Sequence, residues 1–215
     1  MGFFVVDPNG NITAVSDSHL ANGIEYNVPE DIANIKASMN DYKWVDDTLI
    51  HAPMPDHYHS WNGTEWEYNP ELFADAQMQV EQKILALRDK LKYEGYQATL
   101  STGQWWIQND EVSRTQQLGL AAVAALTIFG QLGVPHLPAF PANGVMWKTM
   151  NLDSNERNIV ISMTLSDVLI AFATELQYES AMYTNAERHL EIMLASNDPL
   201  NYDYSGGWPP VYPGS

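Results

Sequence analysis

Apolar and polar residues alternate in short runs over the first third of the chain, which is the pattern of half-buried β-strands. Two hairpins are predicted, over 3–16 and 57–68, because Asn9-Gly10 and Asn62-Gly63 supply the positive φ angles that tight hairpin turns require. The other elements expected here are extended segments at 42–45 and 48–51 and a short helix at 29–38. The first 68 residues therefore predict a small β-rich module.

Downstream, the apolar residues recur with a period of about 3.6, which predicts three long helices. The first begins at Asn69-Pro70-Glu71, a cap residue followed by a proline and an acid. It is expected to end before Gly95, and its apolar stripe consists of Phe73, Ala76, Val80, Ile84, Leu87 and Leu91. Such a stripe is compatible with packing on its own domain or with a coiled coil, and the usual role of core stripes favours packing.

The second helix is predicted over 110–130, where Asn109 or Asp110 can cap the first turn. The third begins at the capping-box sequence 164–167 and continues to about Ala195. Its buried face is predicted to hold Val168, Phe172, Leu176, Tyr183, Ala186, Leu190 and Met193. Between the helices we expect strands at 96–100, 104–108, 145–148 and 158–162, and a well-packed proline-rich loop at 133–143.

These elements predict an α+β fold, in which the small N-terminal β-rich module precedes an α-rich domain with three long helices and short β-hairpins. The expected divisions are the module at 1–68, the helical domain at 69–196 and a tail at 197–215 that is rich in proline, glycine and aromatic residues. Charge supports the first boundary. Residues 1–68 hold eleven acids and two bases, a net charge of −9, whereas residues 69–215 hold sixteen acids and eight bases, a net charge of −8.

The prolines and glycines of the tail predict that it has no regular structure. Its aromatic side chains nevertheless predict that it docks on a surface, for which a neighbouring chain is a candidate; these are Tyr202, Tyr204, Trp208 and Tyr212. Residues 209–212, Pro-Pro-Val-Tyr, also match the pattern that WW domains bind as a polyproline helix. An extended segment lying along a surface is the favoured interpretation.

The composition removes several classes of function. The net charge is −17, from 27 acids and 10 bases, whereas nucleic acids and anionic membranes attract clustered lysine and arginine. There is no cysteine, which excludes disulfides, thiolate zinc sites and cysteine nucleophiles. The sequence shows no apolar run of the roughly 18–20 residues that a membrane span needs and no secretion signal. It also shows no phosphate-binding glycine loop or nucleophile–base motif, and it predicts no catalytic residue and no cofactor. A hydrolase remains a further hypothesis, supported only by the abundance of acidic residues.

Three groups of residues are candidates for binding. His57 and His59 would project from one face of a strand, about 7 Å apart, which suits a metal ion, although packing beside Trp61 is the favoured alternative. The pairs Trp61/Trp66 and Trp105/Trp106 could stack on sugars or belong to a core. The core is favoured for Trp105/Trp106. The question stays open for Trp61/Trp66, because a two-stranded hairpin cannot bury both of its faces.

From about residue 57 onward the chain resembles bacteriophage tail-fibre assembly proteins and a domain found in phage tail proteins. The first matching element is the segment 61–66, Trp-Asn-Gly-Thr-Glu-Trp, which looks like an aromatic hairpin common in their middle part. The later matches are a leading helix at 70–94, Gly103 and Trp106, Asp110 with Ser113-Arg114, the strand 145–147, Thr164-Leu165-Ser166, and a long final helix with Ala186. The proline-rich segment 133–143 and the aromatic tail depart from this pattern.

The resemblance implies a non-enzymatic protein that binds a trimeric tail fibre and other tail proteins. It would assist fibre folding and assembly in the host cytoplasm and could remain in the virion tail, and it could form a homo-oligomer. The binding surface is expected at Trp61, Trp66, Tyr204, Trp208 and Tyr212. The alternative is a receptor-binding or tail-tip component that contacts the host surface, with Trp61, Trp66, His57 and His59 as its working surface.

Overall fold

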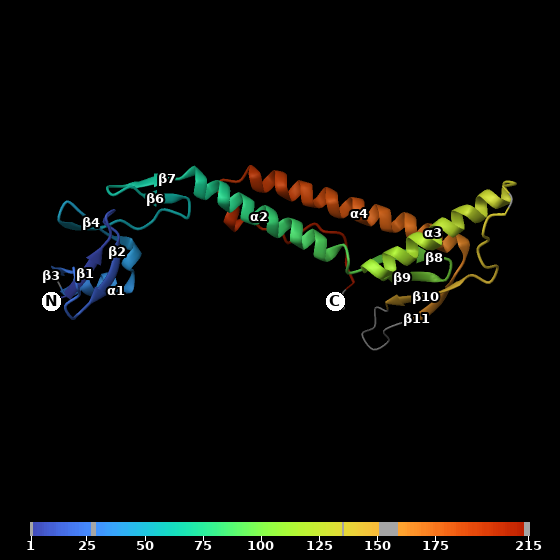
Figure 1. Ribbon diagram of the computed structural model, residues 1–215, viewed down its shortest axis with the longest axis horizontal. Helices are drawn as coiled ribbons and strands as arrows, with labels where there is room; N and C mark the ends of the chain where they lie inside the picture. The colour runs from blue at the N-terminus through green and yellow to red at the C-terminus, as the bar shows by residue number, and fades with distance from the viewer. Residues whose placement is uncertain (1, 27–28, 135, 151–158, 213–215) are drawn as a thin grey trace. The chain divides into compact units, whose positions relative to one another are not determined.

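The computed structural model describes residues 2–26, 29–134, 136–150 and 159–212, with 29–32 described by their backbone only (Figure 1). The fold is α+β, and the chain divides into two compact units, Met1–Gln77 and Met78–Ser215. The division lies inside helix α2 (Pro70–Leu91), whereas the charge pattern placed it near Asn69.

The first unit contains three small antiparallel sheets. The largest has the order β2-β1-β3 and is built from β1 (Gly2–Val6), β2 (Ile12–Ser16) and β3 (Ile24–Tyr26). The remaining strands form two hairpins, β4 (Tyr42–Val45) with β5 (Thr48–His51) and β6 (His59–Trp61) with β7 (Trp66–Tyr68). The helices are α1 (Pro29–Ala37) and the 3₁₀ turn η1 (Met39–Asp41). The predicted hairpins are confirmed, and β3 is an additional strand.

The turns of this unit show which residues accept positive φ angles. At the predicted Asn-Gly turns only the glycines have them, with φ of 79° at Gly10 and 106° at Gly63. The β4–β5 turn instead uses Asp46 and Asp47, whose φ angles are 48° and 58°. Two positive φ angles in a two-residue loop match the right-handed twist of the flanking strands, and aspartate tolerates this region better than most residues.

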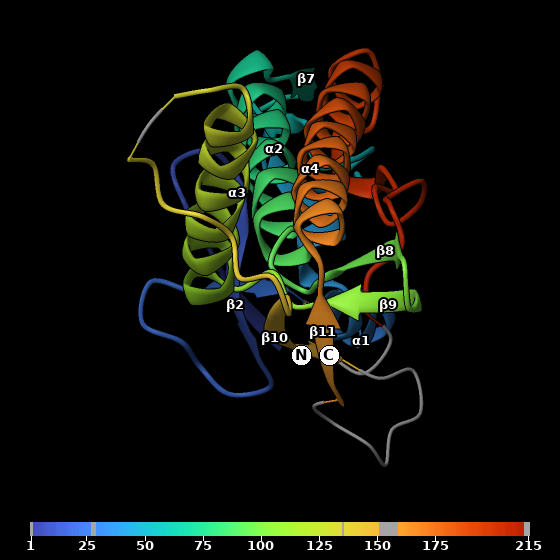
Figure 2. The ribbon, with the colours of Figure 1, turned by 90° about the vertical axis from the view of Figure 1, so that its right-hand side faces the viewer.

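The second unit joins three helices to one four-stranded antiparallel sheet of order β11-β10-β9-β8. The strands are β8 (Tyr96–Leu100), β9 (Gly103–Ile107), β10 (Val145–Met150) and β11 (Ile159–Met163), and the further helices are α3 (Glu111–Gln131) and α4 (Leu165–Leu194). The four predicted strands are confirmed, apart from Asn158, which lies outside the described residues; they pair as two hairpins, β8 with β9 and β10 with β11. They join because Thr149 pairs with Ile107 and Met150 with Trp106. Helices α2 and α4 lie side by side in both ribbon views (Figures 1 and 2).

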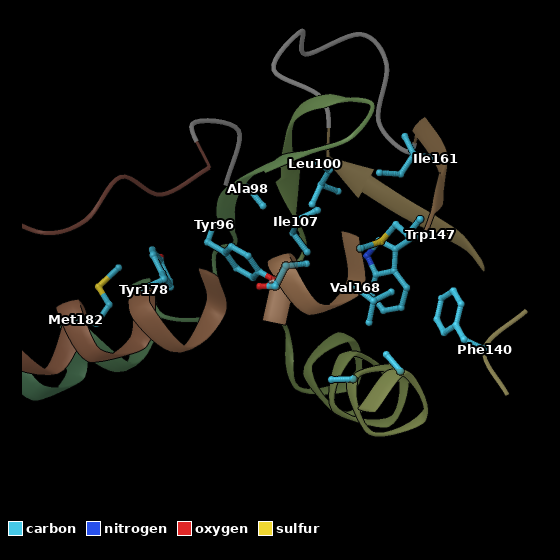
Figure 3. Close-up of a cluster of buried hydrophobic side chains, with 14 residues drawn as sticks. Tyr96, Ala98, Leu100, Ile107, Phe140, Trp147, Ile161, Val168, Tyr178 and Met182 are labelled. Atoms are coloured by element: carbon cyan, nitrogen blue, oxygen red, sulfur yellow. Dashed lines mark hydrogen bonds between the residues drawn. The ribbon is translucent and has the colours of Figure 1, made fainter. Parts of the chain in front are cut away.

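One face of this sheet packs on α3 and α4. Tyr96, Ile107 and Trp147 are buried there, and Figure 3 shows strand side chains pointing toward the helices. The hydroxyl of Tyr96 donates to Gln117 Oε1 (2.6 Å), whose amide nitrogen donates to the carbonyl of Gln108 (2.8 Å). The proline-rich loop is anchored by Phe140, which enters this core and whose backbone N–H donates to Thr127 Oγ1 (2.6 Å).

The predicted helix starts are confirmed by their caps. Asp110 accepts a hydrogen bond from the backbone N–H of Ser113 (3.0 Å), so it caps α3 and Asn109 does not. Thr164 and Asp167 form a complete capping box at the start of α4. These short-range bonds satisfy N–H groups that the first helical turn leaves unpaired.

The predicted buried face of α4 is partly wrong. Leu176 and Tyr183 are 52% and 45% exposed, whereas the buried stripe of α4 includes Glu175, Asn185 and His189. These polar side chains have partners, although the buried Nδ2 of Asn185 has none among the described residues. Glu175 lies beside Arg114, Asn185 Oδ1 accepts from Arg188, and His189 bonds to the tail. The apolar periodicity therefore predicted the wrong buried face for the part of α4 that contains Leu176 and Tyr183.

Helix α2 packs within its own chain, as the favoured interpretation of its stripe predicted. Val80 and Ile84 of its predicted stripe form one buried cluster with Ala186 and Met193 of α4. Tail residues pack against this cluster, among them Tyr202, Tyr204 and Trp208. The tail also contains a short 3₁₀ turn, η2 (Pro199–Asn201), which the sequence did not predict.

Candidate binding surfaces

The hairpin β6–β7 brings Trp61 and Trp66 opposite each other in the strand register. Their rings meet edge to face, with 5.5 Å between centroids and an interplanar angle of 70°. Both side chains are half-buried, and Trp66 Nε1 donates to the carbonyl of Ala52 (2.9 Å). The predicted aromatic pair is therefore assembled, and it is anchored to the segment before the hairpin.

Lys43 of β4 lies against this pair. Its ammonium is 4.7 Å from the centroid of Trp66 and 5.8 Å from that of Trp61, within the range of cation–π attraction. Lys43 is only 4% exposed, and it also donates to the carbonyl of Asn40 (3.1 Å). Burial lowers the pKa of Lys43, an effect that nearby Asp7 and Asp41 oppose. One side of the aromatic pair is thus occupied by a cation of the same unit.

The metal-site hypothesis rested on His57 and His59 sharing a strand, and that premise is wrong. β6 begins at His59, and His57 lies in the preceding turn. His59 Nδ1 is instead 2.7 Å from Asp56 Oδ1. Among the residues that the structure describes, no group of three or more His, Asp or Glu side chains is placed to hold a metal ion.

The tail lies on its own chain, where the sequence left a neighbouring chain as a candidate. His189 Nε2 lies 2.8 Å from the carbonyl of Gly206, and His189 Nδ1 lies 2.7 Å from the hydroxyl of Tyr202. The indole of Trp208 stacks on the same imidazole, with 5.4 Å between centroids, and its Nε1 donates to the carbonyl of Tyr204 (2.8 Å). The buried histidine is thus a polar anchor for this segment.

Tyr212 extends the tail onto the sheet. It is 6% exposed, and its ring packs edge-on against Trp106 at 5.8 Å and 75°. Because successive residues of a strand face opposite sides, Trp106 lies on the sheet face that points away from Trp105 and Ile107. Trp105 packs on the helix-facing core, whereas Trp106 is buried by the tail. The core assignment of the tryptophan pair is confirmed, with one ring on each face.

An exposed apolar stripe on α3 was missed by the sequence reasoning. We call it the α3 stripe; it ends at Leu132, the residue that caps the C-terminus of α3. Its members recur at steps of four, three, four and three: Leu118, Ala122, Ala125, Phe129 and Leu132. The three large members are 59%, 53% and 75% exposed. A neighbouring side of α3 is buried through Gln117, Ala121 and Ala124.

A signal for this surface was present in the sequence. Residues 115–134 contain no charged side chain, and they are apolar around most of the helix rather than on one face. One helix face is enough to contact a single core. The surplus apolar residues therefore had to lie on another surface.

Neither a membrane-spanning helix among the described residues nor a similarity to known proteins adds to these surfaces. In the described part of the chain, no helix has the length and apolar character needed to cross a membrane. A comparison of the chain with family models, with curated proteins and with solved structures finds no match.

Proposed function

We propose that this chain is a non-enzymatic, tail-fibre-associated protein of a bacteriophage, which binds the fibre through its first unit and assists fibre folding and assembly. Support comes from the construction of that unit. Its core cluster joins three buried side chains in the part of the chain that the structure describes, Phe4, Ile12 and Ile35. Its strands are divided among sheets of three, two and two strands.

Two-stranded sheets are marginal by themselves, and their edge strands present unpaired backbone groups. A partner that adds a strand to such an edge supplies both the missing hydrogen bonds and apolar cover. We infer that the partner is a subunit of the trimeric fibre that the resemblance implies. The charge of −9 on residues 1–68 directs the docking toward a basic or neutral surface.

The test is co-expression of the full chain with tail-fibre proteins, followed by affinity purification of the fibre. We expect the two to co-purify. The variant Glu65→Lys/Glu67→Lys on the β6–β7 hairpin should weaken the complex, whereas Glu187→Lys/Glu191→Lys on exposed positions of α4 should leave it intact. Failure to co-purify with any fibre protein would reject the proposal. Mass spectrometry of purified virions would then show whether the chain leaves after assembly or stays in the host-facing tail.

The half-exposed Trp61/Trp66 pair favours a second candidate, a receptor-binding or tail-tip component. In that case Trp61→Ala should abolish adsorption to the host while particles assemble normally. Normal adsorption with defective fibres would favour the assembly function instead.

A further inference from the structure

We propose that two copies of this chain associate through the α3 stripe, as an antiparallel helix pair related by a two-fold axis. The stripe has the alternating spacing of a coiled-coil seam, and its large members Leu118, Phe129 and Leu132 are exposed. Such a seam stabilises a helix pair when it meets another of the same kind. The proposal does not depend on the fibre-binding role of the first unit.

The order of side-chain sizes indicates a second copy as the occupant. From Leu118 to Phe129 the stripe is large, small, small, large, with Ala122 and Ala125 in the middle. An antiparallel pair centred between the alanines places Leu118 of one copy beside Phe129 of the other, and it places Ala122 beside Ala125. A two-fold interface requires this kind of self-complementary surface. The small central residues permit an interaxial distance near the lower end of the usual 8–10 Å range.

Charge selects the same surface and the same orientation. The chain carries a net charge of −17, so copies repel each other over most of their surface. The α3 stripe lies in a segment without charged side chains, where that repulsion is weakest. A parallel pair would bring Glu111 of one copy toward Glu111 of the other, whereas an antiparallel pair brings it toward the uncharged end of α3.

A groove extends the surface beyond one helix. At the N-terminal half of α3, Leu118 lines a groove of about 350 Å³ together with Phe172 and Leu176 of α4. Charged side chains form most of the rest of its wall, and Arg114 pairs there with Glu175 and Glu179. Leu176 is one of the two exposed residues of α4 that the periodicity had placed in the core, the other being Tyr183. The exposure of Leu176 next to Leu118 is accounted for if a second copy covers both.

Sedimentation velocity of the full chain over a range of concentrations tests the proposal. We expect a dimer, and we expect Phe129→Glu to raise its dissociation constant at least about 100-fold, because it places two charges in an apolar interface. The control is Val112→Glu, which changes a 67% exposed residue of the same helix outside the stripe and should leave the dimer unchanged. Circular dichroism establishes that each variant is folded.

Cysteine cross-linking provides a second measurement, since the chain contains no native cysteine. Ala122→Cys/Ala125→Cys should form a covalent dimer on mild oxidation, and Val112→Cys should not. A wild-type chain that stays monomeric at every concentration, or a dimer that survives Phe129→Glu with the variant folded, would overturn the proposal. So would a monomer that binds neutral phosphatidylcholine vesicles through the α3 stripe, since that result would make the occupant a lipid surface.

Discussion

Tyr212 and Trp106 pack edge to face with 5.8 Å between ring centroids, so the tail of the chain covers Trp106 on the sheet face that α3 and α4 leave open. The contact makes the tail part of the folded second unit. It also explains why a tryptophan on the outer face of a sheet is almost fully buried.

The first prediction concerns this contact. Tyr212→Ala should lower the free energy of unfolding by about 2 kcal/mol, because a buried aromatic side chain and its ring pair are lost. The loss cannot exceed the free energy that holds the tail in place, since the tail can detach locally. The Tyr212→Ala variant should show faster hydrogen exchange in β9 and in the tail. The control Ile192→Ala, at an exposed position of α4, should change neither the free energy of unfolding nor these exchange rates.

Two adjacent glycines give a matched test of the tail's backbone. Gly207 has a φ of 80°, and a Cβ there would lie 2.4 Å from Arg188 Nη2 and 3.2 Å from Asn185 Oδ1. Gly207→Ala should therefore destabilise the docked tail by about 1–2 kcal/mol, the usual cost of a left-handed conformation for a residue with a side chain. At Gly206 nothing lies within 4 Å of the added atom. Limited proteolysis should cut the tail of the first variant faster, and equal rates for both variants would contradict this account.

The environment of Asp167 predicts how the stability of the fold depends on pH. Burial alone would raise its pKa, but hydrogen bonds from the backbone and side chains of Ser101 and Thr164 outweigh it and lower the pKa to about 2. Because this value is below that of the unfolded chain, the ionised carboxylate stabilises the fold at neutral pH, and that stability is lost as the pH falls toward 2.

The measurement for Asp167 is a series of urea titrations. Asp167→Asn should cost about 2 kcal/mol at neutral pH, and the difference from wild type should shrink between about pH 4 and pH 2. A difference that stays constant over this range would show that the cost arises from packing rather than from the charge.

We expect Arg114 to stabilise the second unit because it compensates the charge of the buried Glu175. Its Nε lies 3.7 Å from Glu175 Oε1, and its guanidinium also pairs with Glu179. Burial raises the pKa of Glu175, and the positive charge of Arg114 opposes this increase. Arg114→Met should cost about 3 kcal/mol at neutral pH, because it leaves a buried charge without its partner.

The paired control is Arg114→Met/Glu175→Gln, which should recover much of that loss because the buried charge is gone. A raised folded-state pKa also means that the stability of the single variant should improve as the pH falls and Glu175 becomes protonated. Absence of both effects in thermal unfolding would remove Glu175 as the cause.

Local signals in the sequence predicted the elements well. Asp110, Thr164 and Asp167 cap helices through bonds to backbone groups three residues away, so the interaction is contained in the sequence pattern itself. The same holds for the hairpins at Gly10 and Gly63, where the turn residue alone provides the required backbone freedom.

Interactions between distant segments could not be predicted in this way. The β9–β10 pairing and the Tyr212–Trp106 contact join segments that no periodicity relates. His57 was misplaced because the strand begins two residues later than its pattern indicated. The buried side of α4 was misjudged because Glu175 and His189 obtain partners from Arg114 and from the tail, which are visible only in three dimensions.

The sheet order β11-β10-β9-β8 also has a consequence for how the second unit folds. Its two outer pairings are hairpins that close over short stretches of chain, whereas the central pairing must wait until α3 and its following loop bring β10 back to β9. Long-range closures of this kind are slow because the entropy of the intervening chain is lost before the contact forms. We therefore expect pulse-labelled hydrogen exchange to show both hairpins protected first, the β9–β10 bonds later, and the tail last of all.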